Sequence, residues 1–406
     1  MKIVLCDHII TCAQDKAKLT DMPCAILVDG EKIVAIGAEN DVKAKAAADV
    51  EVINLKGKYV LPGMIDAHLH LSFSSSTQPV TELVNDSDDE ILLREVRAAQ
   101  MELRCGVTTV RDSGARGMSI LKLRDFIRQG LIEGADIISA GMPITTTGGH
   151  CNFCGLECDS TDDVRKAVRM LCKNGVDYIK VMVSGGNMTP GSASTITQYN
   201  LEQLTAIVEE AHCHGKMVSG HVHTVQSIGD SIIAGFDTLE HCSFKAANGD
   251  EDYREDLVQM MLEKGTVVCP GFSKSYVVSA EEGAPQPDKV AMWDAFKTSR
   301  FKTTSAMWNS GVPIIAGTDA GCKNTKFDEF WKILPLLEEK IGMTKEETLL
   351  ACTSRSAKAL GYEDQIGSLE EGKLANIIAV DADPLNDLAA MQMVSFVMKR
   401  GKTVAL

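Results

Sequence analysis

The sequence predicts an α/β protein: a (β/α)8 barrel, or TIM barrel, with a small β-sandwich domain formed by both chain termini. Eight short apolar runs recur between residues 59 and 361, most of them separated from the next by an amphipathic stretch of helical length. Strand-like runs also crowd the two ends, at residues 1–58 and 362–406. We therefore expect the barrel to span 59–361 and the two ends to meet in one sheet domain.

The predicted elements follow one another in a regular order. Residues 25–37 hold two apolar runs around Asp29-Gly30, which predicts a β-hairpin. Amphipathic stretches such as 91–106 and 201–215 predict helices between the barrel strands. An open, doubly wound sheet is the alternative, but no G-x-G-x-x-G motif follows an early strand, which weakens it. The barrel strands themselves are expected at 59–71, 107–114, 136–141, 177–186, 216–224, 237–244, 266–272 and 312–321.

The composition narrows the class of protein. Of 406 residues, 45% are hydrophobic and 24% are charged, close to the average of globular proteins. Lys and Arg number 41 and Asp and Glu number 56, so the formal net charge is −15. That charge disfavours nucleic acid and anionic membranes as partners, and no apolar stretch reaches the roughly 18–20 residues of a membrane span. We expect neither kind of partner.

Thirteen cysteines are unusual for such a chain. In a small secreted protein they would suggest a disulfide framework, but this chain is long, the count is odd, and its start resembles a pair of short strands better than a secretory signal. We therefore expect reduced thiols and a cytoplasmic location. Cys151, Cys154 and Cys158 resemble a metal-binding knuckle beside a histidine, but no second C-x-x-C motif completes it.

The histidine pair in IDAHLHL is the first sign of a metal site. If this run is a strand, His68 and His70 point to the same side of it. Two imidazoles on one face make half of a transition-metal site, although an H-x-H pair alone is weak evidence.

Further polar residues occupy equivalent positions in later runs. His221, His241 and Asp319 each come at the end of an apolar run, where a barrel displays its active site. Lys180 lies within DYIKVMVSGG and would point into the barrel interior, where an unpaired ammonium group is costly. A structural role, such as a salt-bridged lysine or a capping aspartate, would explain any one of these positions alone. The six residues together, with His68 and His70 included, favour a functional site.

With these residues in place, the chain resembles the metal-dependent amidohydrolase superfamily. Within it, the chain is similar to the branch of imidazolonepropionase-like hydrolases, Xaa-Pro dipeptidases and zinc carboxypeptidases. The resemblance covers nearly the whole chain and rests on LPGMIDAHLH, GVTTVRDSGA, IKVMVSGG, AGTDAG and IGSLEEGKLANIIAVDADP.

The resemblance implies a ligand set. His68, His70 and Asp319 would hold one divalent ion, and His221 and His241 a second, with Zn²⁺ as the expected metal. Lys180, carboxylated by CO2, would bridge the two as an anionic oxygen donor. Ring-opening relatives use one metal and lack this lysine, so its presence favours two metals.

The resemblance also implies a reaction. Two ions lower the pKa of a shared water, and Asp319 would move a proton from that water to the leaving nitrogen of a peptide-like amide. A dipeptide or N-acyl amino acid would be the substrate of an Xaa-Pro dipeptidase or carboxypeptidase type of enzyme. Ring opening of a cyclic amide, or deamination, is the alternative. A non-catalytic descendant is a third, although none of the six residues is missing.

Two further histidines are candidates for substrate binding. His150, in TTTGGHC, matches a family histidine proposed to contact the substrate carbonyl or carboxylate. His223 shares the inward face with His221, but dipeptide-cleaving relatives often have tyrosine there, as H-A-Y rather than H-V-H. This departure leaves the exact specificity open. Relatives of this branch commonly assemble, so we also expect a homo-oligomer.

Overall fold

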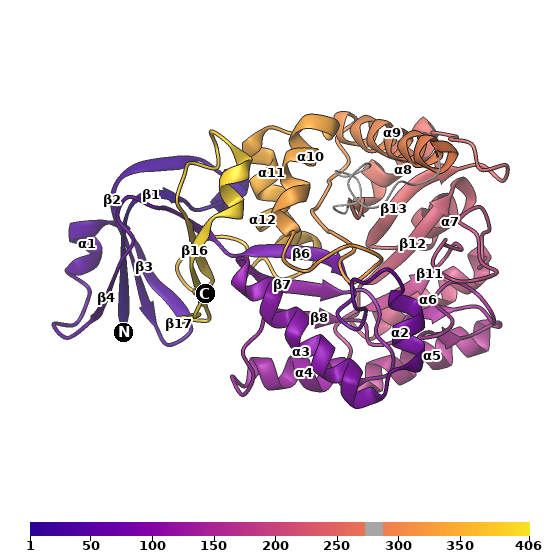
Figure 1. Ribbon diagram of the computed structural model, residues 1–406, viewed down its shortest axis with the longest axis horizontal. Coiled ribbons are helices and arrows are strands. Elements are labelled where there is room, and N and C mark those ends of the chain that lie inside the picture. The colour runs from indigo at the N-terminus through magenta and orange to yellow at the C-terminus, as the bar shows by residue number, and fades with distance from the viewer. Residues whose placement is uncertain (273–286) are drawn as a thin grey trace.

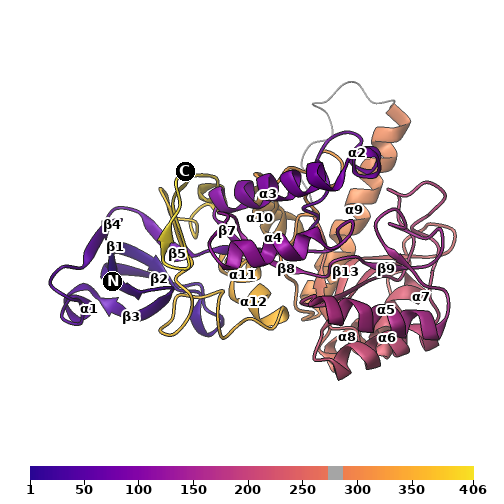
Figure 2. The ribbon, with the colours of Figure 1, turned by 90° about the horizontal axis from the view of Figure 1, so that it is seen from below.

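The computed structural model describes residues 1–272 and 287–406. A small sheet at one end carries both chain termini, and a larger α/β part makes up the rest (Figure 1). Figure 2, seen from below, shows the same division, with the N and C labels on one side and α3 (Asp88–Arg104) and α4 (Ser119–Arg128) covering the other part.

The larger part is a barrel of parallel strands. One sheet joins β6, β7 and β8, and a second joins β11 to β14 in sequence order, with β9 (Ile144–Thr145) and β10 (Leu156–Glu157) at its edge. A hydrogen bond of 2.8 Å from the amide of Asp177 to the carbonyl of Ser139 links the two sheets. The bounds are β6 Met64–Leu69, β7 Val107–Asp112, β8 Asp136–Ser139, β11 Ile179–Met182, β12 Val218–Thr224, β13 Thr238–Lys245 and β14 Val267–Cys269.

The eighth position of the barrel is filled by residues 312–321. This segment is not a regular strand, yet Ile314 pairs with Val268 of β14 and Ala320 pairs with Leu69 of β6, both in parallel. It therefore closes the ring, and the predicted (β/α)8 class with an added sheet domain is confirmed.

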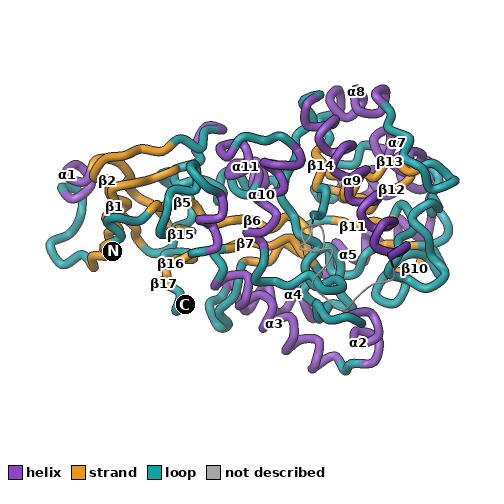
Figure 3. The backbone as a smooth tube through the Cα atoms, turned by 45° about the horizontal axis from the view of Figure 1, so that its top comes forward, coloured by secondary structure: helices purple, strands orange, loops and turns teal. Residues whose placement is uncertain are grey.

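Helices surround the strands (Figure 3). Several begin at reciprocal capping pairs, such as Ser160 with Asp163 and Asn200 with Gln203, which satisfy amide groups of the first turn. The helices are α2 Pro79–Asn85, α3, α4, α5 Thr161–Asn174, α6 Leu201–Cys213, α7 Val225–Ala234, α8 Glu255–Lys264, α9 Pro287–Asn309, α10 Ile333–Leu336, α11 Lys345–Ala351 and α12 Ser354–Ala359.

The small sheet is built from both ends of the chain. Its order is β17-β16-β15-β5-β1-β2-β3, with β4 also pairing with β1, and α1 (Glu39–Lys43) lies beside it. Val4 and Ile26 near one edge pack in one cluster with Ile377 and Met398 near the other, so the sheet folds over its own core. The strands are β1 Lys2–Ile10, β2 Leu19–Asp29, β3 Lys32–Ala38, β4 Glu51–Asn54, β5 Tyr59–Pro62, β15 Ile377–Val380, β16 Val394–Lys399 and β17 Lys402–Thr403.

The run at 59–71 departs from expectation. We predict one barrel strand there, starting at residue 59, but the structure divides the run at Gly63. Its first part, β5, pairs with β1 and β15 in the terminal sheet, and only β6 belongs to the barrel. Because apolar residues continue on both sides of Gly63, from Tyr59 to Ile65, hydrophobic periodicity does not reveal the division.

Candidate metal centre and active site

All eight predicted site residues line one cavity of about 230 Å³. It lies at the carboxyl ends of the barrel strands, where parallel barrels carry their active sites. The residues come from β6 and its extension (His68, His70), the loop after β9 (His150), β11 (Lys180), β12 (His221, His223), β13 (His241) and the 312–321 segment (Asp319).

The first histidine pair is oriented by its outer ring nitrogens. Nδ1 of His68 lies 2.6 Å from Oε2 of Glu240, and Nδ1 of His70 lies 3.1 Å from the carbonyl oxygen of Gly114. Both partners are acceptors, so each Nδ1 donates and each Nε2 keeps a free lone pair. The two Nε2 atoms lie 3.5 and 3.4 Å from Oδ1 of Asp319. These three side chains therefore direct donor atoms toward one point.

Glu240 is a site residue that the sequence reasoning misses. It is fully buried and joins His68 to Arg111, whose Nη2 lies 2.6 Å from Oε1 of Glu240. Burial alone would raise the pKa of Glu240, but the charges of Arg111 and His68 lower it well below its usual range. Glu240 is therefore an ionised partner that fixes the ring of His68. Glu240 lies directly beside His221 in the parallel pairing of β12 and β13, and that pairing is the signal that identifies it as a residue of the site.

The side chain of His241 breaks the inward–outward alternation of side chains along β13. Parallel register places Glu240 beside His221, facing inward, and His241 beside Val222, which faces outward. His241 has φ of 67°, a conformation that is rare for a residue with a side chain, and its ring still lies 4.6 Å from that of His221. Two consecutive residues of β13 thus reach the same interior.

Lys180 and His221 each bring a buried nitrogen into the cavity. Lys180 has no exposed surface, and His221 is 7% exposed. Within residues 1–272 and 287–406, neither Nζ of Lys180 nor Nε2 of His221 has a hydrogen-bond partner. Burial lowers the pKa of Lys180, followed by the charge of Arg111, while Glu240 acts in the opposite direction. Unsatisfied buried nitrogens of this kind fit a site that takes up a cation and its ligands.

Asp319 occupies a strained position. Its φ is 61°, and its amide donates a hydrogen bond of 2.7 Å to the carbonyl of His68. Burial would raise the pKa of Asp319, but hydrogen bonding to His70 and the charges of the histidines hold it well below the usual range. Asp319 is therefore an ionised carboxylate at neutral pH.

Three groups of donors are close enough to hold a metal ion. In each group the ligand atoms lie within 4.8 Å of one another, in the part of the chain that the structure describes. His68, His70 and Asp319 form one group, as predicted. His221 and His241 form another together with His223, which we predict to bind substrate instead. The third joins His68 and Glu240 with Cys269.

The substrate candidates are also anchored on their outer side. Nδ1 of His150 lies 3.0 Å from Oγ1 of Thr189, and Nδ1 of His223 lies 2.7 Å from Oγ of Ser243. The rings of His150 and His221 are 4.6 Å apart. Lys323 lies at the cavity as an exposed cation.

The three clustered cysteines do not form a site of their own. All thirteen cysteines lie in the described residues and none is in a disulfide. Cys151 and Cys154 pack with Met182 and Cys322 near the cavity, whereas Cys158 belongs to the main barrel core. No donor group found within residues 1–272 and 287–406 combines these three thiols.

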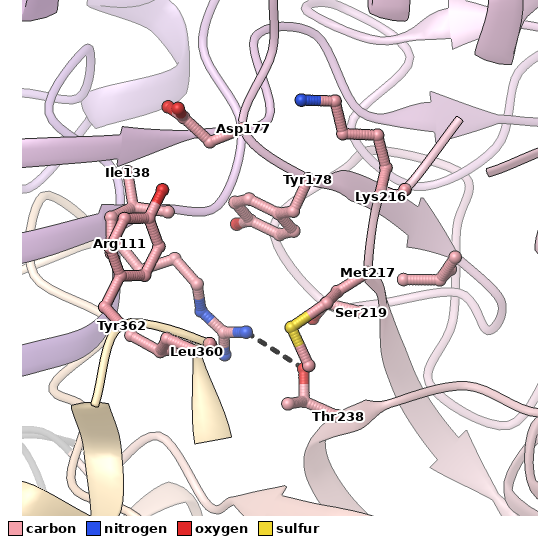
Figure 4. A pocket seen from close by; sticks show the side chains of 13 residues that line it. Arg111, Ile138, Asp177, Tyr178, Lys216, Met217, Ser219, Thr238, Leu360 and Tyr362 are labelled. Atoms are coloured by element: carbon pink, nitrogen blue, oxygen red, sulfur yellow. Dashed lines mark hydrogen bonds between the residues drawn. The ribbon is translucent and has the colours of Figure 1, made fainter. Parts of the chain in front are cut away.

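A second cavity, of about 400 Å³, lies at the opposite end of the barrel. It is reached by Arg111, Tyr178, Lys216 and Thr238, near the amino ends of the strands (Figure 4). There Nη1 of Arg111 donates a hydrogen bond of 2.9 Å to Oγ1 of Thr238, and Nη2 donates to Oε1 of Glu240. Arg111 is paired with Glu240 and Asp177 of this cavity with Arg124, whereas the candidate metal ligands converge in the histidine-lined cavity, so we assign the candidate chemistry to the latter.

None of the described helices is both long enough and apolar enough to span a bilayer.

Comparisons with known proteins identify the family of this chain. The model of the amidohydrolase family matches residues 59–404. Ochratoxinase from Aspergillus niger is 27% identical, over 97% of this chain and 88% of the relative. Imidazolonepropionase from Shouchella clausii is 25% identical, over 94% of this chain and 85% of the relative. The crystal structure of a Xaa-Pro dipeptidase with bound methionine in the active site is 27% identical with a TM-score of 0.86, covering 100% of both chains.

Proposed function

Since this chain belongs to the amidohydrolase family, it is a hydrolase of carbon–nitrogen amide bonds, and we propose that it cleaves a peptide-like amide with two divalent metal ions. The superfamily and branch indicated by the motifs are thereby confirmed. The observation that carries the proposal is the convergence of six candidate ligands on one cavity, with two of their nitrogens buried and without a hydrogen-bond partner in residues 1–272 and 287–406.

The residues fit two ions. His68, His70 and Asp319 would hold one, and His221 and His241 the other, with Zn²⁺ as the metal that suits imidazole and carboxylate donors. Lys180 would join the two as a carbamate, formed when its neutral amine adds CO2 and loses a proton. Burial of Lys180 favours the neutral amine, and the carbamate would supply an anionic oxygen donor at a position where Nζ has no partner among the described residues.

Divalent ions bound in such a pair lower the pKa of a shared water and polarise an amide carbonyl. The chain's own part in the reaction falls to Asp319. As an ionised carboxylate held among the two first histidines, it can accept the proton of the attacking water at an oxygen and deliver it to the leaving nitrogen.

The cavity favours a small acidic substrate. His150 and His223 line the same cavity as the six candidate metal ligands and would bind a carbonyl or carboxylate oxygen, and Lys323 adds a positive charge. A dipeptide or N-acyl amino acid with a free carboxylate has the required groups. These features support our proposal of an activity of the Xaa-Pro dipeptidase or carboxypeptidase type.

The test combines metal analysis with a substrate panel. Purified full-length protein should contain about two divalent ions per chain and should cleave members of a panel of dipeptides and N-acyl amino acids. One ion per chain, with cleavage of cyclic amides only, would support the imidazolonepropionase type of reaction instead. Absence of amide cleavage across the panel in metal-replete enzyme would refute the proposed substrate class.

Asp319→Asn should lower kcat by at least about a thousandfold, because the amide neither accepts nor returns the proton. The matched control is Asp89→Asn, an exposed aspartate in the first turn of α3, which should keep wild-type turnover. Both variants are compared after reconstitution with Zn²⁺, with thermal unfolding as the check on folding. Near-wild-type activity of Asp319→Asn would remove this residue from the mechanism.

A cytoplasmic location and assembly into a homo-oligomer remain predictions. Fractionation of cells expressing the chain, and light scattering of the purified protein, are the measurements that check them.

A further inference from the structure

A chain of hydrogen bonds runs from α9 to His223. Arg300 of α9 is 1% exposed, and its Nη1 donates to Oγ of Ser243 over 3.0 Å. The same guanidinium donates to the backbone carbonyls of His241 and Pro270. Oγ of Ser243 in turn lies 2.7 Å from Nδ1 of His223. The three side chains are thus linked in series, and the last of them lines the catalytic cavity.

The order of donors in this chain can be worked out. A guanidinium has only donors, so the Ser243 hydroxyl oxygen accepts from Arg300. The Ser243 proton then needs an acceptor, and Nδ1 of His223 is the acceptor found for it among the described residues. If Nδ1 carried a proton instead, the serine would face two donors and its own proton would be left without a partner, which is costly in a buried site. His223 therefore carries its proton on Nε2.

This arrangement is opposite to that of the first histidine pair. His68 and His70 donate from Nδ1 to a carboxylate and a carbonyl, which leaves each Nε2 as a lone-pair donor for a metal. His223 accepts at Nδ1 and so presents an N–H. This explains how a histidine whose ring lies 4.6 Å from that of His221 can stay out of the metal coordination.

We propose that Arg300 and Ser243 are positioning residues that hold His223 as a hydrogen-bond donor, through Nε2–H, to an oxygen atom of the substrate. The proposal rests on the proposed amide hydrolysis and deepens it. The donor suits a carbonyl oxygen that gains negative charge as the amide is attacked, or a substrate carboxylate.

The first test observes the proton directly. Zn²⁺-loaded, ¹⁵N-histidine-labelled protein is measured by long-range ¹H–¹⁵N NMR, with His223 assigned by the signals that disappear in His223→Ala. We expect an unprotonated Nδ1 and a protonated Nε2 for His223, and loss of this preference in Ser243→Ala. A protonated Nδ1 in the wild type would overturn the proposal, and this readout does not depend on any activity.

The second test is a double-mutant cycle on kcat/KM, using the best substrate of the dipeptide and N-acyl amino acid panel. Ser243→Ala should lower kcat/KM about tenfold, the cost of one hydrogen bond, and His223→Ala about a hundredfold. In the His223→Ala background, Ser243→Ala should change kcat/KM less than twofold. Equal losses in both backgrounds would show that Ser243 acts without His223.

Two controls separate the possible failures. Ser231→Ala removes another fully buried hydroxyl, in α7, and should leave kcat/KM unchanged. Zn²⁺ content should be the same in wild type, Ser243→Ala and His223→Ala; loss of an ion in His223→Ala would make His223 a ligand and refute the proposal. If the wild type cleaves no panel member, the proposed function fails, while the NMR result still decides the proton position.

Discussion

At the scale of single residues, the partner behind the ring orients His68, His70 and His223. In our proposal, a carboxylate or carbonyl behind the ring leaves Nε2 free to bind a metal, whereas a hydroxyl that already accepts from an arginine leaves Nε2 as a hydrogen-bond donor. The sequence predicts which residue types meet, because their positions at the ends of apolar runs identify them. It does not predict these partners, since they come from neighbouring strands and a helix far along the chain.

Glu240 shows how strongly one such partner acts. Glu240→Ala leaves Arg111 buried without its counter-charge, so we expect the free energy of unfolding to fall by about 3–5 kcal/mol, with weaker Zn²⁺ binding. Urea denaturation and metal titration measure the two effects. The control Glu209→Ala removes an exposed partner of Arg165 and should cost less than about 1 kcal/mol. A similar, small loss for both variants would contradict a buried network.

Glu95 of α3 gives a prediction for pH. Its carboxyl accepts from Ser72 over 2.7 Å, and burial raises its pKa to about 8, above the usual 4.5. The folded protein thus holds a proton that the unfolded chain releases, and the stability from Glu95 is present below about pH 4.5 and is lost as pH rises toward 8. Urea unfolding of wild type relative to Glu95→Gln should show a declining difference from pH 5 to 8. A difference in the free energy of unfolding that does not change with pH would contradict a raised pKa for Glu95.

At the scale of elements, the eighth barrel segment is the least regular and the most consequential. Residues 312–321 pair with both neighbours by isolated bridges, and Asp319 departs from extended geometry within it. The sequence predicts a strand there from its apolar run. It does not predict the irregularity, because that arises from close approach of the backbone to His68 and His70.

Gly321 makes this close approach possible. Its φ is 94°, and an added Cβ would lie 2.1 Å from the carbonyl oxygen of His70. Gly321→Ala should therefore displace the His70 backbone, lower the melting temperature by several degrees and reduce Zn²⁺ content. Gly191→Ala is the control, since it also replaces a glycine of positive φ but meets open space. Equal effects of the two substitutions would show that the loss of stability and of Zn²⁺ comes from backbone strain alone and not from contact with His70.

At the scale of the whole molecule, an ion cluster joins the terminal sheet to the barrel. Asp136 begins β8, and its two carboxylate oxygens bind Lys399 over 2.9 Å and Arg400 over 2.8 Å. Both cations come from the end of β16 and the turn after it. The sequence indicates that the two ends of the chain share a sheet, but it contains no local pattern that pairs residue 136 with residues 399 and 400.

Asp136→Asn should lower the free energy of unfolding by about 2 kcal/mol, because the partly buried Lys399 loses its counter-charge while Arg400 keeps its ion pair with Glu31. Turnover should change less than twofold, since Asp136 is at the amino end of its strand, opposite the site. Thermal unfolding and kcat/KM measure these effects. The control Asp381→Asn breaks a half-exposed ion pair within the terminal sheet and should be nearly neutral.

The interleaving of the terminal sheet also constrains the order of assembly in the cell. Strand β15 pairs with β5 on one side and β16 on the other, so β5 lacks this neighbour until residues 377–380 have been synthesised. The entire barrel is synthesised in between. The open edge of β5 is thus exposed during that interval, when a chaperone or a premature contact with another nascent chain would compete for it.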